Sequence, residues 1–214
     1  MGTVLDVTSA SAAAGTNVQT YTFNQSTAQK WTLLETEKTL YSIMGKTNVS
    51  VSQMVKFYKN KATVSYPYSN VSEAPTIEKF CQIYKEESEV EGVKAEVAFA
   101  QAMMETGFLK FGGDVKKDQY NFAGIGAIGG GSSGAKFDSI RIGIRAHVQH
   151  LKAYASKEAL KQPVVDPRFQ YVKRGSAEYV QWLGQKENPN GYGWATSEGY
   201  GIDIEKMVKN LQTY

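Results

Sequence analysis

The chain has 214 residues, of which 42% are hydrophobic and 21% charged, as expected for a globular protein with one ordinary domain and a smaller part. Its net charge of +3 is mild and no Lys/Arg cluster stands out, so the sequence excludes a strongly basic nucleic-acid binder but suits an anionic polymer. No apolar run approaches the ~20 residues of a membrane-spanning helix, and we expect no signal peptide in MGTVLDVTSA. The single cysteine, Cys81, excludes an internal disulfide.

Three sections follow one another along the chain. Residues 1–36 contain two short runs rich in β-forming residues, VLDV and VQTYTF, separated by small polar residues. Residues 37–75 are predicted to be a linker with one short helix, Val51 to Lys59, and residues 76–214 to be a mainly helical domain. The fold predicted is therefore α+β, mainly α, with a helical body, a small Gly-rich β insert and a short β segment before it.

Capping residues mark the first helices of the third section. Thr76 is the expected N-cap of a helix that Gly92 ends. A second helix is predicted from about Val93 to Thr106, with Gly107 as its C′ residue. The run NFAGIGAIGGGSSGAKF is too rich in glycine for a helix and predicts turns and short strands. Three further helices are predicted near residues 144–157, 176–183 and 202–211.

Glu105 lies in the last turn of the second predicted helix, within the run AMMETGFLKF. A helix C-terminus disfavours negative charge, so the dipole is expected to raise the pKa of this carboxyl group. The apolar neighbours Met104 and Phe108 penalise the anion as well. A glutamic acid that stays protonated near neutral pH is what protonation of a glycosidic oxygen requires, although a solvated glutamate at a helix end fits these residues at least as well.

Three sequence blocks decide between these two interpretations. They are ETG at 105–107, YNFAGI at 120–125, and WAT at 194–196 followed by Tyr200. Over roughly residues 76–214 the chain thereby resembles the bacterial glucosaminidases of glycoside hydrolase family 73. The resemblance implies a lysozyme-like fold that cuts the glycan strand of peptidoglycan after N-acetylglucosamine, with Glu105 as general acid. It also implies a secreted or wall-associated protein, of bacterial or phage origin, that needs no cofactor.

The second catalytic group stays open at this point. Glycoside hydrolysis usually employs two carboxylates, ~5–5.5 Å apart for retention and ~6.5–9.5 Å for inversion. Asp138 in KFDSIRIG is the best match in register to the family, but it also stands where an N-cap belongs. Asp114 is a weaker candidate, and Tyr200 matches a cleft tyrosine that could orient the acetamido group of the substrate instead. The residues expected to bind the glycan are Tyr120, Asn121, Phe122, Tyr192 and Trp194.

Other site types are excluded by what surrounds their motifs. GIGAIG at 124–129 matches a dinucleotide fingerprint, but more glycine follows it instead of a helix. His147 and His150 are three residues apart, yet zinc needs further ligands and the chain has two histidines in all. We therefore expect no metal site. The alternatives that remain are a lytic transglycosylase or muramidase on the same fold, and a non-catalytic cell-wall-binding module.

The N-terminal residues resemble one repeat of a ricin-type β-trefoil lectin. The repeat ends in the Q-x-W signature, QKW at 29–31. By the resemblance Asp6, Gln19, Tyr21 and Gln29 match positions of a sugar site, but Ala28 stands where that family has Asn, which argues against sugar binding. One repeat cannot bury its own apolar face, so we interpret residues 1–36 as part of a truncated lectin module.

Overall fold

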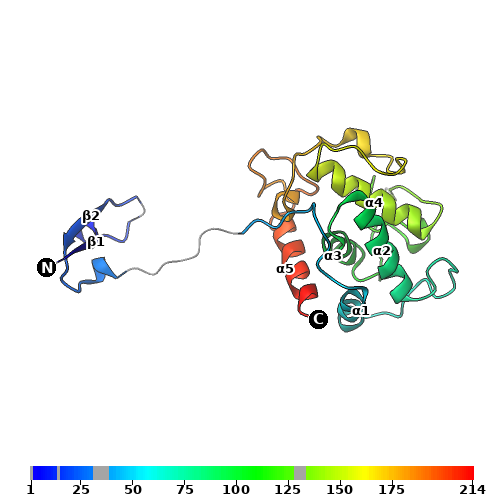
Figure 1. Cartoon of the computed structure of the whole chain (residues 1–214), viewed down its shortest axis with the longest axis horizontal. Helices are drawn as coiled ribbons and strands as arrows, with labels where there is room; N and C mark the ends of the chain where they lie inside the picture. The colour runs from blue at the N-terminus through cyan, green and yellow to red at the C-terminus, as the bar shows by residue number, and fades with distance from the viewer. Residues whose placement is uncertain (1, 14, 31–38, 128–133) are drawn as a thin grey trace. The chain divides into compact units, whose positions relative to one another are not determined.

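The computed structural model describes residues 2–13, 15–30, 39–127 and 134–214. The chain forms two compact units, Met1–Thr39 and Leu40–Tyr214, which are drawn in Figure 1. Within the described residues the second unit contains five α-helices and the first a two-stranded sheet. The prediction of a mainly α fold preceded by a short β segment is confirmed. No helix in the described part of the chain is long and apolar enough to cross a membrane.

The first unit is built on a β-hairpin. Strands β1 (Thr3–Val7) and β2 (Val18–Thr22) run antiparallel, with Val4 opposite Tyr21. Short 3-10 helices follow each strand, η1 at Thr8–Ala10 and η2 at Thr27–Gln29. The buried carboxylate of Asp6 accepts hydrogen bonds from Gln19 at 3.5 Å and from Gln29 at 3.1 Å, so the lectin-like polar residues bond to one another. Trp31, which completes the Q-x-W signature, lies outside the described residues.

The first two helices of the second unit begin at side-chain caps. Helix α1 (Val51–Lys61) starts with a capping box, in which Ser50 accepts from the backbone of Gln53 and the Gln53 side chain accepts from the backbone of Ser50. Helix α2 (Ile77–Glu91) is capped by Thr76, as predicted, and ends at Gly92 in the left-handed region with φ 74°. Both helices therefore satisfy their orphan backbone groups within a few residues of sequence.

Helix α3 (Ala95–Thr106) is the centre of the second unit. It contacts each of the other four helices, and Figure 1 shows it lying among them. Its residues are mostly small or apolar all round, which is the pattern of a helix buried on every side. Gly107 ends it at φ 56°, as expected. Glu105 thus lies in the last turn of a buried helix, directly before the loop that follows Gly107.

Helix α4 (Ile140–Ala155) corrects one expectation. Its N-cap is Ser139, whose hydroxyl accepts from Ile142 N at 3.3 Å, and not Asp138. Glu73 fixes the start of the helix from a distant segment, because its carboxylate accepts from Ser139 at 3.2 Å and from the backbone of Arg141 at 3.1 Å. The exposed Asp138 stands one residue too early to cap this helix.

The C-terminal part differs from the prediction in one helix and matches it in the last. The helix predicted at 176–183 is only a 3-10 turn, η5 (Val180–Leu183), because the residues before it are extended and pair with the chain near Ile43. Ile43 N donates to Glu178 O at 3.0 Å, and Val180 N to Tyr41 O at 2.8 Å. Helix α5 spans Tyr200–Gln212 and covers the predicted residues 202–211.

The glycine-rich segment forms turns in its described residues, 120–127 and 134–139, and no strand is present among them. Ala135 N donates to Ile125 O at 2.8 Å, which joins the two sides of this segment, while the central residues 128–133 lie outside the described part. Gly143 in α4 lets the segment approach closely, because a Cβ there would lie 1.8 Å from Tyr120 O.

Residues 40–75 belong to the second unit instead of standing apart as a linker. Helix α1 buries Met54 and Phe57 in the same core as the later helices, and Ile43 is fully buried there too. The sequence pattern of polar turns around a short helix did not reveal this packing, because the apolar residues of α1 have their partners far along the chain.

Candidate active site

The carboxyl group of Glu105 lines a cavity of about 280 Å³ at the C-terminal end of α3. The side chain is accessible to solvent through this cavity. Gly107 and Phe111 on one side and Gly124 on the other contribute to the walls. A carboxyl group that acts on a polymer needs a hollow beside it to hold the polymer, and Glu105 has one.

Burial among protein atoms raises the pKa of Glu105, and a hydrogen bond from Tyr200 opposes this by lowering it. The residue as a whole is exposed towards the cavity, yet nearby protein atoms remove part of the hydration of its carboxyl group. Loss of hydration is the larger effect, so the pKa of Glu105 lies above that of an ordinary glutamate. The raised pKa that was expected from the helix dipole is therefore present, and its main cause is burial.

A chain of buried hydrogen bonds fixes the direction of the Tyr200 hydroxyl. Gln101 lies one turn before Glu105 on α3, and its Nε2 donates to Tyr200 Oη at 2.8 Å. The Tyr200 hydroxyl donates its own proton to Glu105 Oε1. The Gln101 amide oxygen lies 2.9 Å from His147 Nε2, and Tyr84 Oη lies 3.1 Å from His147 Nδ1.

The protonation states in this chain of bonds follow from the donors available. Complete burial lowers the pKa of His147 to about 3, so its ring is neutral and carries one proton. The Gln101 oxygen can only accept, which places that proton on Nε2 and makes Nδ1 the acceptor for the Tyr84 hydroxyl. Each group therefore donates towards Glu105 or holds a group that does.

Of the two aspartates considered from the sequence, Asp114 shares the cavity with Glu105 and is half-buried. Asp138 is exposed beside the start of α4 and is not among the residues that line this cavity. The structure therefore brings the weaker of the two sequence candidates into the cavity that Glu105 lines. Register within the family pattern favoured Asp138, whereas the loop after α3 folds back and carries Asp114 to the cavity.

Two predicted glycan contacts have structural roles instead. Both amide hydrogens of Asn121 are used, by Ile125 O at 2.9 Å and Ala135 O at 3.0 Å, and its oxygen accepts from Ile125 N at 2.9 Å. Asn121 thus shapes the cavity wall but has no hydrogen left for a ligand. Phe122 has 0% exposure and packs edge-on against Phe80, so it cannot stack on a sugar. Tyr120 is partly buried against the core.

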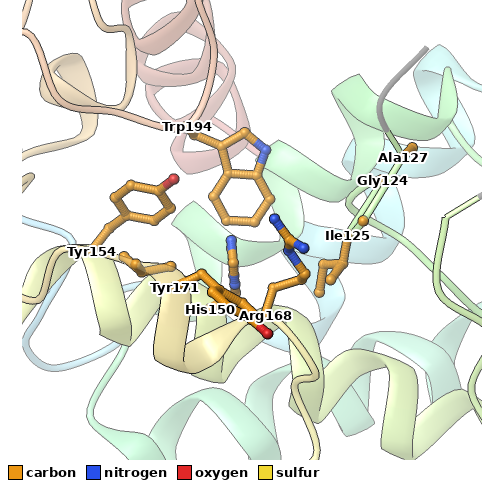
Figure 2. Close-up of a pocket in the computed structure, with 10 residues that line it drawn as sticks. Gly124, Ile125, Ala127, His150, Tyr154, Arg168, Tyr171 and Trp194 are labelled. Carbon is orange, nitrogen blue, oxygen red and sulfur yellow. The ribbon is translucent and has the colours of Figure 1, made fainter.

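Trp194 lines a second cavity, of about 230 Å³, which Figure 2 shows in close-up. This cavity shares Gly124 and Ala127 with the Glu105 cavity, so the two are adjacent. Tyr192 is 41% exposed and lines a different hollow, where the ammonium of Lys173 lies 3.8 Å from its ring centroid. Trp194 therefore lines a cavity adjacent to that of Glu105, and Tyr192 precedes it by two residues in the same loop. Their binding to a glycan stays a prediction.

Several site residues were not identified from the sequence. Gln101 could have been found, because it lies four residues before Glu105 and so on the same helix face. Arg168 and Tyr171, which line the second cavity, come from a loop whose position no local pattern reveals. In the described part of the chain no cluster of three or more His, Cys, Asp or Glu side chains is arranged to hold a metal ion.

Comparison with known proteins adds independent information. Residues 81–213 match the glucosaminidase family model, described as mannosyl-glycoprotein endo-beta-N-acetylglucosaminidase, and residues 1–64 match a ricin-type beta-trefoil lectin domain-like model. An uncharacterized protein of Borreliella burgdorferi is 46% identical over 131 residues, which is 61% of this chain and 61% of that protein's length.

A similar fold is found in the crystal structure of S. aureus Autolysin E in complex with the muropeptide NAM-L-ALA-D-iGLU, with a TM-score of 0.52 and 19% identity. The match covers 81% of this chain and 71% of that one, and at this identity it shows the fold alone. The family model, in contrast, spans most of the unit that contains Glu105 and both cavities. The chain therefore belongs to the glucosaminidase family and carries a ricin-type lectin-like segment at its N-terminus.

Proposed function

We propose that this chain hydrolyses the glycan strand of peptidoglycan after N-acetylglucosamine, with Glu105 as the general acid. The observation that carries the proposal is a carboxyl group at the wall of a cavity, with its pKa raised by burial and its orientation held by Tyr200. Such a group retains its proton at a pH where an ordinary glutamate has lost it. The proposed place of action is outside the cytoplasm, where the wall lies.

Glu105 would donate its proton to the bridging oxygen as the glycosidic bond breaks and positive charge develops on the sugar ring. A second group must stabilise that charge. Asp114 is available because it lines the same cavity, and the substrate's own acetamido group is the other possibility. Asp138 is not among the residues that line this cavity. Tyr200 already bonds to Glu105 and Gln101, so the role we assign to Tyr200 is to hold the acid in place.

The closest competing function is a lytic transglycosylase, which also needs one acid but leaves a 1,6-anhydro product. Mass spectrometry of digested peptidoglycan separates the two functions. New reducing-end N-acetylglucosamine supports the hydrolase, and anhydro-muramic ends contradict it.

A non-catalytic wall-binding module is the second competitor, and Glu105→Gln distinguishes it. This substitution keeps the size of the side chain and its ability to accept from Tyr200, but removes the transferable proton. The variant is expected to bind walls and to lose lysis. Lysis at the parent's rate would show that Glu105 is not the acid.

A further inference from the structure

The second cavity differs from the first in carrying a positive charge. Aromatic rings of Trp194, Tyr154 and Tyr171 line it together with the side chain of Arg168. Figure 2 shows the guanidinium group of Arg168 reaching into the space between Trp194 and Ile125. A ligand that extends from the Glu105 cavity past the shared residues Gly124 and Ala127 would meet this guanidinium group.

The charge of Arg168 is not neutralised by the protein. Among the described residues its side chain forms no ion pair and no hydrogen bond. The nearest acid in sequence, Asp166, bonds to other groups: one of its oxygens lies 2.7 Å from His150 Nδ1 and the other accepts from the backbone N of Arg168 at 2.8 Å. Five N–H donors are therefore left for a ligand.

The loop that holds Arg168 is fixed to helix α4. The side-chain oxygen of Gln149 accepts from Val165 N at 2.8 Å, and its nitrogen donates to Pro163 O at 2.9 Å. The buried bond between His150 and Asp166 fastens the next turn. Tyr171 then supports the guanidinium group, whose Cζ lies 4.7 Å from the ring centroid. The backbone of Arg168 is thus fixed before a ligand arrives, while its side chain is exposed to solvent.

Aromatic faces suit a sugar ring, and a planar guanidinium group suits a carboxylate, which it can bind through two parallel hydrogen bonds. A glycan of N-acetylglucosamine alone carries no charge. In peptidoglycan the alternate sugar bears a lactyl group whose carboxyl is joined to a stem peptide by an amide bond, so the free carboxylates of this unit belong to the stem peptide. We propose that this cavity is a subsite for a muramyl unit and that Arg168 binds the carboxylate which that unit carries. This inference rests on the proposed function. The carboxylate is the part of the substrate by which Arg168 would distinguish peptidoglycan from chitin.

Binding by a chain that cannot cleave tests the subsite. The parent for this experiment carries Glu105→Gln, and its dissociation constant is measured with soluble uncrosslinked peptidoglycan strands and with a chitin oligosaccharide. Adding Arg168→Gln is expected to weaken binding to the strands about tenfold and to leave chitin binding unchanged. Arg168→Lys is expected to recover part of the loss, because lysine retains the charge but not the planar fork.

Lys173→Gln is the matched control, because it removes a cation from the same loop. The ammonium group of Lys173 lies over the ring of Tyr192, and these two residues line a different hollow. The proposal would be overturned if Lys173→Gln weakened binding to the strands as much as Arg168→Gln does. It would also be overturned if Arg168→Gln weakened binding to chitin equally or did not weaken binding to the strands, or if the parent bound no strands. Strands whose stem-peptide carboxylates have been converted to amides test the bound group directly: the loss caused by Arg168→Gln should disappear on them, and an equal loss would overturn the proposal. Failure of the active chain to cleave walls would instead contradict the proposed function, and this binding comparison does not depend on cleavage.

Discussion

Replacing Tyr200 by Phe tests how the hydrogen bond from Tyr200 changes the pKa of the Glu105 carboxyl group. The substitution keeps the ring in the core and removes the hydroxyl group that donates to Glu105. A hydrogen bond to a charged group contributes about 1.5–3 kcal/mol, and the lower end applies here because the carboxyl group is open to the cavity. The bond stabilises the carboxylate, so its loss raises the pKa of Glu105 further.

Two changes are therefore expected in the pH–rate profile of wall lysis. The alkaline limb moves to higher pH, because the acid form persists longer without Tyr200's hydrogen bond. The maximal rate falls about tenfold, because the acid loses the contact that orients it. Tyr58→Phe is the matched control, since the Tyr58 hydroxyl is buried without a partner in the described structure and lies outside the cavity. An alkaline limb that stays in place or moves to lower pH in Tyr200→Phe would refute the reasoning.

Three further predictions concern stability. Because the folded state raises the pKa of Glu105, the stability linked to this group is complete below the ordinary glutamate range and is lost as the pH rises through the folded-state value; Glu105→Gln should therefore raise the thermal midpoint at neutral pH and lose this advantage in acid. Glu91→Gln should lower the free energy of unfolding by about 3–5 kcal/mol in urea titrations, because it leaves the fully buried ammonium of Lys152 unpaired. Gly143→Ala should cost about 3 kcal/mol or more in the same assay, because its Cβ would collide with the backbone oxygen of Tyr120; a loss below about 0.5 kcal/mol in either variant would contradict these contacts.

Local signals in the sequence were sufficient where the deciding contacts are local. Thr76, Gly92 and Gly107 were identified as helix ends because each acts on backbone groups within a few residues. Glu105 was placed in the last turn of its helix for the same reason, and its apolar surroundings suggested the direction of its pKa shift. What the residues alone did not provide was the choice between a solvated and a functional glutamate, which depended on the family resemblance.

Contacts between distant segments could not be predicted. Phe122 looks like a cleft aromatic beside Asn121, but its ring is enclosed by residues of α2 and the segment before it. Residues 176–179 have helical character, yet they pair with the chain near Ile43, more than a hundred residues earlier. The presence of Asp114 in the lining of the Glu105 cavity, and the absence of Asp138 from it, likewise depend on where two loops end in space. In each case the deciding partner is absent from the local sequence.

The most direct test of the account is the titration of the Glu105 carboxyl group itself. Carbon-13 NMR of side-chain carboxyl groups, with the resonance assigned by its disappearance in Glu105→Gln, follows this group alone. We predict a pKa above the usual glutamate range, because burial outweighs the hydrogen bond from Tyr200. A pKa at or below the value of an exposed glutamate would mean that the group is ionised at neutral pH, and it could not then act as the proton donor.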